Sequence, residues 1–215
     1  MPVLPYCILL ESSAAEIPVK GIEDSSIFRL TEGRLSTLYS ELQTSDISLK
    51  TLQPAALQYH NVVQAVFEQI AVVPFRFPTW LTQAELVAHL QQQSHRYTTF
   101  LTDHANHVQM EVRLTLPSKS PRSEAAPSGT AHLRARAAEC RRLRSSADTL
   151  KTLLSSEVVA WRERETQMGL RLFALVDRAR IADFRERLSK RDRETGARCS
   201  GPWPATEFLE PAAEI

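Results

Sequence analysis

Residues 60–90, HNVVQAVFEQIAVVPFRFPTWLTQAELVAHL, contain two amphipathic helix patterns that are joined by a connector with two prolines. Before the connector, apolar side chains recur at intervals of three and four residues, which predicts one buried helix face. They are Tyr59, Val62, Val63, Val66, Phe67 and Ile70. Pro54 suits the first turn of this helix, where a missing N–H costs nothing. Pro74 and Pro78 keep the residues before them out of the helical region, so we expect residues 71–80 to be extended.

A capping box follows the connector, because Thr82 stands three residues before Glu85, and it predicts the start of a second helix. The apolar face of this helix continues through Tyr97 and Leu101, and we expect the helix to end near residues 104–107. Short apolar or alternating segments predict strands at residues 5–11, 25–33, 34–42 and 108–114. Strands around two helices indicate an α+β fold.

The stretch PSKSPRSEAAPSG, residues 117–129, is rich in proline and serine and predicts a linker. We therefore expect an N-terminal α+β domain over residues 1–116 and a C-terminal α+β domain over residues 130–215. The second domain begins with a heptad-like seam, which predicts one long helix over residues 131–161, roughly 45 Å in length. The seam comprises Leu133, Ala137, Cys140, Leu143, Ala147, Leu150, Leu154, Val158 and Trp161.

Several seam positions are small, which weakens a free-standing coiled coil, so packing within the chain and a coiled-coil partner both stay open. After the long helix, residues 168–177 predict a buried strand and residues 181–190 a short amphipathic helix. Residues 200–210 are expected to be extended, because two prolines flank Trp203.

The charge of the chain is balanced overall but uneven along its length. Twenty-six basic and 25 acidic side chains give a net charge of +1, which is unlike a strongly basic nucleic-acid binder. Residues 130–198 hold 17 basic and 10 acidic side chains, whereas the segments on either side are both net acidic. Fifteen of these 17 cations are Arg, which favours planar contacts with carboxylates. The basic segment is either a solvated helical surface or the binding surface for an acidic partner.

The sequence contains none of the common catalytic or cofactor motifs, which include GxxxxGK[ST], GxGxxG, HExxH, GxSxG and CxxC. We therefore expect no enzyme activity, no cofactor and no metal. Three widely spaced cysteines indicate a reducing compartment without a structural disulfide. The N-terminus lacks a basic region, and the apolar stretches are too short to cross a bilayer, so we expect a cytoplasmic protein without a signal peptide.

Three motifs of this chain resemble the gas vesicle accessory proteins of the L/F family. In that family, a helix with an early His leads into a turn with the pattern hhPhRFGT. The matching residues here are His60, Pro74, Arg76, Phe77 and Thr79, while Pro78 replaces the usual Gly. SGTAHLRARAA resembles the start of the family's long helix, with His132 in place of Tyr, and GPWPATEFLE resembles its C-terminal GPWPPYSF.

The resemblance covers most of residues 55–116 and 129–210 and carries implications for fold and function. It implies a ferredoxin-like N-terminal domain, followed by a second α+β domain that contains a long helix. It also implies a non-enzymatic protein that takes part in forming gas vesicles, the hollow protein shells that give cells buoyancy. The implied partners are the small hydrophobic shell protein and other accessory proteins, and the implied locations are the gas vesicle and the cytoplasm.

Candidate protein-binding residues follow from residue type, because aromatic side chains and Arg dominate interface energetics. We select Phe75, Arg76, Phe77, Trp80, Arg141, Arg142, Trp203 and Phe208. Trp203 is either a packing anchor or a recognition residue. Two other functions stay open: a nucleic-acid-associated protein that uses the Arg-rich segment 130–198, and an enzyme with an unrecognised pocket at the connector.

Overall fold

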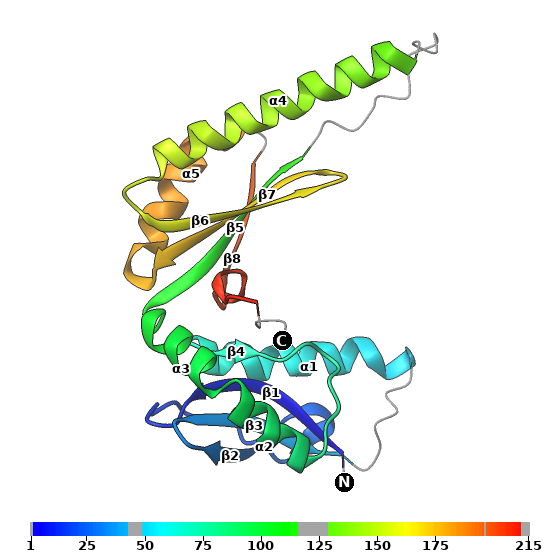
Figure 1. Ribbon diagram of the computed structural model, residues 1–215, viewed down its shortest axis with the longest axis vertical. Helices are drawn as coiled ribbons and strands as arrows, with labels where there is room; N and C mark the ends of the chain where they lie inside the picture. The colour runs from blue at the N-terminus through cyan, green and yellow to red at the C-terminus, as the bar shows by residue number, and fades with distance from the viewer. Residues whose placement is uncertain (1, 43–48, 116–128, 196, 212–215) are drawn as a thin grey trace. The chain divides into compact units, whose positions relative to one another are not determined.

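The computed structural model describes residues 2–42, 49–115, 129–195 and 197–211, and it divides the chain into two compact units. The first unit comprises Met1–Asn106 and Pro204–Ile215, and the second comprises His107–Trp203. Each unit is a mixed structure with one antiparallel four-stranded sheet and helices packed against it (Figure 1). The predicted α+β fold class is therefore confirmed.

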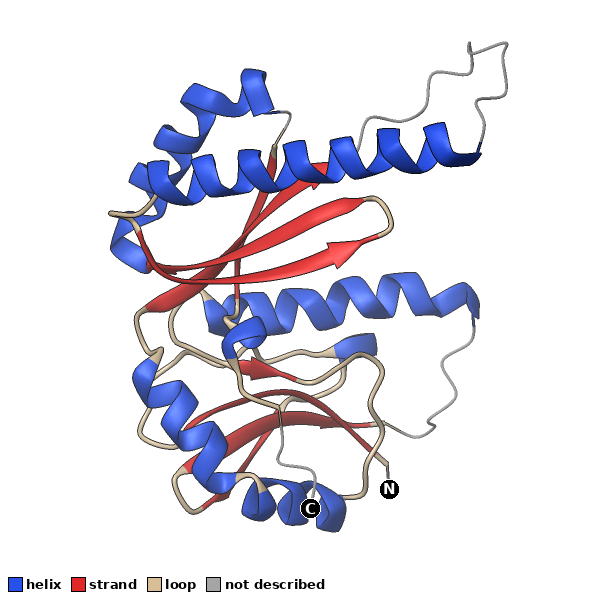
Figure 2. Cartoon of the chain, turned by 45° about the horizontal axis from the view of Figure 1, so that its top comes forward, coloured by secondary structure: helices blue, strands red, loops and turns tan. Residues whose placement is uncertain are grey.

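The first unit is built on the strand β1 (Val3–Leu10), whose residues are almost all buried. Its sheet has the order β2-β3-β1-β4, with β2 at Phe28–Glu32, β3 at Leu35–Glu41 and β4 at Val73–Pro74. The helix α1 (Leu49–Phe67) lies on one side of this sheet, and α2 (Gln83–Gln92) and α3 (Ser94–Asp103) lie on the other (Figure 2). A continuous apolar strand such as β1 is expected where both faces of a sheet are covered.

The helices of the first unit bury the apolar faces that the sequence predicts, but some of them begin or end at other residues than predicted. The predicted face of α1 is buried at Tyr59 and Val66, and the capping box at Thr82 and Glu85 is present at the start of α2. Pro54 lies inside α1 rather than in its first turn, so that prediction is wrong. The single helix expected up to residues 104–107 is two helices, because the backbone at Gln93 leaves the helical region (φ −100°, ψ 8°).

The second unit has the element order β-α-β-β-α-β. Its sheet order is β6-β7-β5-β8, with β5 at His107–Thr115, β6 at Val158–Thr166, β7 at Gly169–Asp177 and β8 at Arg198–Trp203. The helices α4 (Gly129–Leu153) and α5 (Ile181–Thr195) cover one face of this sheet (Figure 1). The predicted apolar rows in residues 108–114 and 170–176 form the core beneath them, with every member at most 4% exposed.

The long helix is shorter than predicted. Residues 131–161 were expected to be one helix, but α4 ends at Leu153, and Val158 and Trp161 lie in β6. The heptad spacing continues past the true end of the helix, while β6 pairs with β7 along almost its whole length. This strand pairing overrides the helical pattern, as tertiary context commonly does for β-branched residues.

The predicted domain boundary at residue 116 also differs from the structure. β5 was expected to belong with the preceding helices, but it is a central strand of the second sheet, between β7 and β8. The pairing of a strand depends on segments that lie far away in the sequence. The alternation of apolar and polar residues within β5 therefore does not show which strands it pairs with. The predicted linker at 117–129 lies outside the described residues except for Gly129, which is the first residue of α4.

The ferredoxin-like description of the first unit stays a prediction. Its strand order is that of a split βαβ sheet. However, residues 11–27 between β1 and β2, all of which the structure describes, contain only a short 3-10 turn (Ile22–Asp24) where that fold has a helix. The complete β-α-β-β-α-β element order instead occurs in the second unit.

On the face of the second sheet that α4 and α5 do not cover, the carboxylate of Glu111 forms ion pairs with two Arg side chains. Arg113 Nε donates to Glu111 Oε1 at 2.7 Å, and Arg171 Nε donates to the same oxygen at 2.5 Å. Burial by itself would raise the pKa of Glu111, but the hydrogen bonds and charges of the two Arg side chains outweigh it and lower the pKa to about 2. The carboxylate therefore joins β5 to β7 as a charged group.

We expect Glu111→Gln to lower the free energy of unfolding by about 1–3 kcal/mol at pH 7, because the amide loses the charge that both Arg side chains face. Because folding depresses the pKa of Glu111 from 4.5 to about 2, its contribution is complete above pH 4.5 and is lost as the pH falls towards 2. Urea denaturation at several pH values measures both effects. A difference between the two proteins that does not shrink at low pH would contradict this account.

Candidate protein-binding surfaces

The connector between α1 and α2 is fixed to β1 at both of its ends. β4 pairs with Cys7 and Ile8 of β1, and the backbone of Leu81 exchanges two hydrogen bonds with Val3, at 2.8 and 3.1 Å. Between these points, the single hydroxyl proton of Tyr59 is shared between the Phe75 carbonyl oxygen, at 2.6 Å, and the Tyr6 carbonyl oxygen, at 2.8 Å. The predicted extended connector is therefore present, and α1 and β1 hold it in place.

Side chains alternate along the connector, so its members have different roles. The Phe75 ring packs 5.6 Å from the ring of His89, and the Phe77 ring packs 5.0 Å from that of Tyr59, and both Phe side chains are half-buried. Arg76 lies between them and is exposed, with no carboxylate of the described residues within ion-pair distance. The two Phe rings therefore anchor the connector, and Arg76 is the group that it presents to solvent.

Trp80 is half-buried near the end of the same connector. Of the two predicted aromatic residues at the C-terminus, Phe208 is buried in a 3-10 turn of the first unit and is only 8% exposed. Its position is that of a packing residue. Trp203, the last residue of β8, is 36% exposed, so it remains accessible to a partner.

The backbone before Trp203 depends on Gly201. Gly201 has a φ of +115°, and a side chain there would place its Cβ 2.9 Å from the Gln109 carbonyl oxygen. The register between β5 and β8 shifts at the same place, between Gln109 and Glu111. The indole N–H of Trp203 donates to Ser200 Oγ at 3.4 Å, which orients the ring. The GPWP motif therefore forms an irregular strand end that leaves a tryptophan at the surface.

Arg141 and Arg142 lie on α4, and both are exposed. The helix is covered unevenly along its length. Toward its C-terminal end, the seam residues Ala147 and Leu150 are 1% exposed, and Leu154, which directly follows the helix, is 0% exposed. Toward its N-terminal end, the seam residues Ala137 and Cys140 are exposed. Of the seam side chains that the structure describes on α4, those in the second half of the helix are therefore the covered ones, and Figure 2 shows α4 continuing past the strands.

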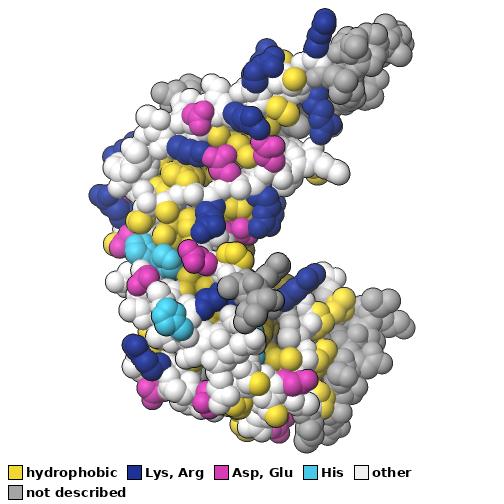
Figure 3. Space-filling view, viewed as in Figure 1, with side chains coloured by type: hydrophobic (Ala, Val, Ile, Leu, Met, Phe, Trp, Pro, Cys, Tyr) yellow, Lys and Arg dark blue, Asp and Glu magenta, His cyan; other side chains and the backbone are white. Residues whose placement is uncertain are grey.

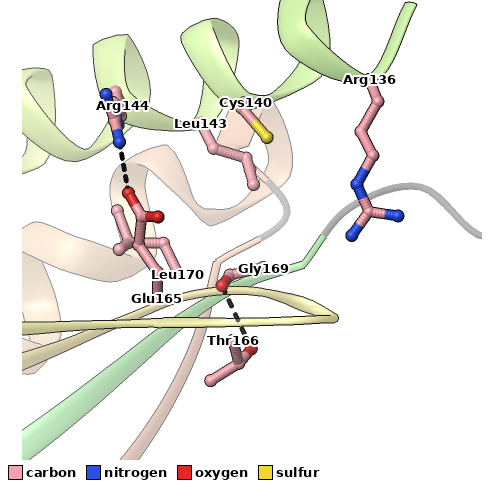
Figure 4. A pocket seen from close by; sticks show the side chains of 8 residues that line it. All are labelled: Arg136, Cys140, Leu143, Arg144, Glu165, Thr166, Gly169 and Leu170. Carbon is pink, nitrogen blue, oxygen red and sulfur yellow. Dashed lines mark hydrogen bonds and ion pairs between the residues drawn. The ribbon is translucent and has the colours of Figure 1, made fainter. Parts of the chain in front are cut away.

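A groove of about 250 Å³ lies between the exposed part of α4 and the β6–β7 hairpin (Figure 4). Its lining comprises Arg136, Cys140, Leu143, Arg144, Glu165, Thr166, Gly169 and Leu170. Arg144 pairs with Glu165 at 2.5 Å across the groove. The selected residues Arg141 and Arg142 do not line it. Arg136 and Arg144 were missed, and their positions beside the apolar seam are the sequence signal that identifies them.

The cavities lined by described residues offer few groups for catalysis. In the groove, Cys140 and Thr166 share the lining with one carboxylate, Glu165, which is paired with Arg144. The linings of two further cavities, of about 360 and 340 Å³, contain no carboxylate and no His. The described residues also contain no group of three or more His, Cys, Asp or Glu side chains that is arranged to hold a metal ion. Burial raises the pKa of the Cys7 thiol to about 12, which makes it unreactive at neutral pH.

The fold and these surfaces define a two-unit α+β protein that presents an exposed Arg-rich helix and accessible aromatic side chains. The sequence model of the family described as "Gas vesicle synthesis protein GvpL/GvpF" matches residues 3–210. The chain therefore belongs to this family, as the sequence motifs indicated. A search of curated proteins finds no match.

Two solved structures share the fold over nearly the whole chain. The gas vesicle protein GvpF from Anabaena sp. PCC7120 is 14% identical, with a TM-score of 0.79, and the match covers 100% of this chain and 98% of that one. GvpF from Microcystis aeruginosa is 13% identical, with a TM-score of 0.78 over 97% and 98% of the two chains. Membership of the family implies a role in gas vesicle assembly. Each helix in the described part of the chain is too short or too polar to cross a bilayer.

Tyr59→Phe tests the attachment of the connector. The variant keeps the ring but removes the donor shared by the Tyr6 and Phe75 carbonyls, so we expect it to lose about 1–2 kcal/mol of unfolding free energy. Thermal and urea denaturation measure this loss. Tyr39→Phe is the matched control, because no side-chain hydrogen bond between described residues involves the Tyr39 hydroxyl. An equal loss in both variants would show that the hydroxyl of Tyr59 does not hold the connector.

Proposed function

We propose that this chain is a non-enzymatic assembly protein of gas vesicles that binds the small hydrophobic shell protein or other accessory proteins while the vesicle forms. The observation that carries the proposal is the combination of family membership with surfaces that the described residues of the chain leave exposed. These surfaces are the N-terminal half of α4, Arg76 on the connector, and Trp203 at the end of β8. Arg and Trp are enriched among the residues that contribute most to protein–protein binding.

The architecture is consistent with this proposal. Buried strands and paired sheets hold the exposed residues on two folded units, so a partner meets them already positioned, which lowers the entropic cost of binding. For the first unit we retain the ferredoxin-like description, which its strand order supports. We place the protein at the forming gas vesicle, on the basis of its family.

The alternative of a nucleic-acid-associated protein has less support. The helix-free face of the second sheet carries Arg residues, and Phe173 lies among them on the central strand β7. Phe173 is only 1% exposed, because the guanidinium groups of Arg164 and Arg171 lie 5.8 and 5.1 Å from the centre of its ring. A covered ring does not offer the stacking platform that single-stranded nucleic acids need. Glu111 also neutralises part of the charge on this face.

Co-purification tests the proposed function directly. We expect the tagged chain, expressed together with the small shell protein and the other accessory proteins, to retain at least one of them specifically. Retention that survives about 0.5 M salt would place the main contact on apolar anchors, because salt at this level screens exposed charges beyond a few ångströms. Loss of retention only at high salt would place it on the Arg-rich surface. No retention at any salt concentration, with the chain folded, would contradict the proposal.

Trp203→Ala tests one of the anchors. If Trp203 is part of the interface, we expect the variant to weaken partner binding by about 2 kcal/mol or more while the melting temperature stays nearly unchanged. Phe28→Ala is the matched control, because Phe28 is also a partly exposed aromatic residue, 43% exposed, on a strand of the other unit. A large drop in the melting temperature would instead assign Trp203 to the core of its unit.

A further inference from the structure

We propose that the exposed half of α4, together with the β6–β7 hairpin, is a docking groove for an acidic amphipathic helix of a partner protein. The proposal rests on the proposed function and deepens it, because it names the chemistry of one partner. The groove is the one described above, between Arg136, Cys140, Leu143 and Arg144 on the helix and Glu165 and Leu170 on the strands (Figure 4).

The first argument is the change of burial along one helix face. Ala147 and Leu150 are buried against the sheet, Leu143 is half-buried, and Cys140 and Ala137 are exposed. These residues continue the same three-and-four spacing, so the apolar face extends beyond the surface that covers it. A row at helical spacing is complementary to a second helix, in the manner of a helix that docks into an apolar groove.

The second argument is the position of the Arg residues relative to this row. At about 100° per residue, Arg136 lies about 40° from Cys140 around the helix axis, and Arg144 lies about 40° away on the other side. Arg142 lies about 160° away, on the opposite face. Arg136 and Arg144 therefore lie on the same face of the helix as Cys140, one turn before it and one turn after it, where a helix docked on this face would meet them.

The third argument is charge, and it selects the partner. Residues 134–144 contain five Arg and one Glu. Of these five, only Arg144 forms an ion pair with a carboxylate of the described residues. Figure 3 shows dark-blue Lys and Arg side chains gathered over α4. The α4 surface of a second copy would bring the same positive charge to the groove and be repelled, whereas carboxylates beside an apolar row match it.

The size of the groove fits side chains rather than a small molecule. Its volume of about 250 Å³ is below the range of about 300–1,000 Å³ that is typical of ligand clefts. Cys140, Leu143 and Leu170 supply an apolar floor, and the Arg144–Glu165 pair crosses it. A partner with apolar side chains every three or four residues would place one or two of them here.

Fluorescence anisotropy with a labelled designed peptide tests this proposal on the full chain. The probe is a helical peptide of about three heptads with Leu at the two core positions and Glu at the flanking positions. Its control replaces every Glu by Lys. We expect the Glu peptide to bind and the Lys peptide not to bind, with affinity that falls as salt rises.

Two variants with the same charge change separate docking from general attraction. We expect Arg136→Glu to weaken binding of the Glu peptide by about tenfold or more, and Arg142→Glu to weaken it by less than about threefold, because Arg142 faces away from the groove. We also expect Leu143→Ala to weaken binding without changing its salt dependence. Circular dichroism and melting temperature confirm that each variant is folded.

Several results would overturn the proposal. If Arg136→Glu and Arg142→Glu weakened binding of the Glu peptide equally, no specific groove would exist. The same would follow if the Lys peptide bound as tightly as the Glu peptide. If duplex DNA displaced the peptide and its binding were weakened equally by Arg136→Glu, the groove would be assigned to nucleic acid. If the chain associated with itself through Arg136, the groove would be assigned to a second copy. Co-purification of gas vesicle proteins without peptide binding would leave the proposed function standing and remove this groove. Peptide binding without co-purification would support the groove and contradict the proposed function.

Discussion

The length of α4 relative to its sheet is the constraint on which the functional part of this structure depends. The helix has 25 residues, about 37 Å at about 1.5 Å per residue, but of its described seam side chains only those in the second half are buried. An isolated helix of about 12 residues is marginal in water, so the exposed half depends on continuity with the packed half. Its uncovered apolar row gains about 25 cal/mol for each Å² that a partner buries. The fold thus leaves exposed the part of α4 that we propose as a docking surface.

The two sheets provide the rigid support that such a surface needs. In the first unit, the Tyr59 hydroxyl and the Leu81 backbone hold the connector against β1, so the backbone that carries the exposed Arg76 is anchored. In the second unit, Glu111 connects two central strands through Arg113 and Arg171. Both sets of interactions provide hydrogen-bond or ion-pair partners for polar groups that would otherwise be costly to bury. Binding surfaces held in this way lose little conformational freedom when a partner arrives.

The sequence predicted the local structure well and the long-range arrangement poorly. The apolar face of α1, the capping box at Thr82 and the core rows of β5 and β7 are periodic patterns within one element, and the structure contains all of them. The end of α4 was missed because the heptad spacing runs on into β6, where strand pairing decides the structure. The domain to which β5 belongs was missed for the same reason. The positions of Arg136 and Arg144 beside the seam can be read from the sequence, but the β6–β7 hairpin that forms the groove with them is a long-range feature.

The most direct test of the central claim is hydrogen exchange along α4, measured on the chain alone and on the chain co-purified with its gas vesicle partners. The account predicts that in the isolated chain the amides of residues 134–144 exchange faster than those of residues 147–153, because opening of the uncovered half costs less free energy. It predicts that residues 134–144 gain protection in the complex. Uniform protection of α4 in the isolated chain, or a complex that leaves residues 134–144 unchanged, would contradict the claim that this half of the helix is the docking surface.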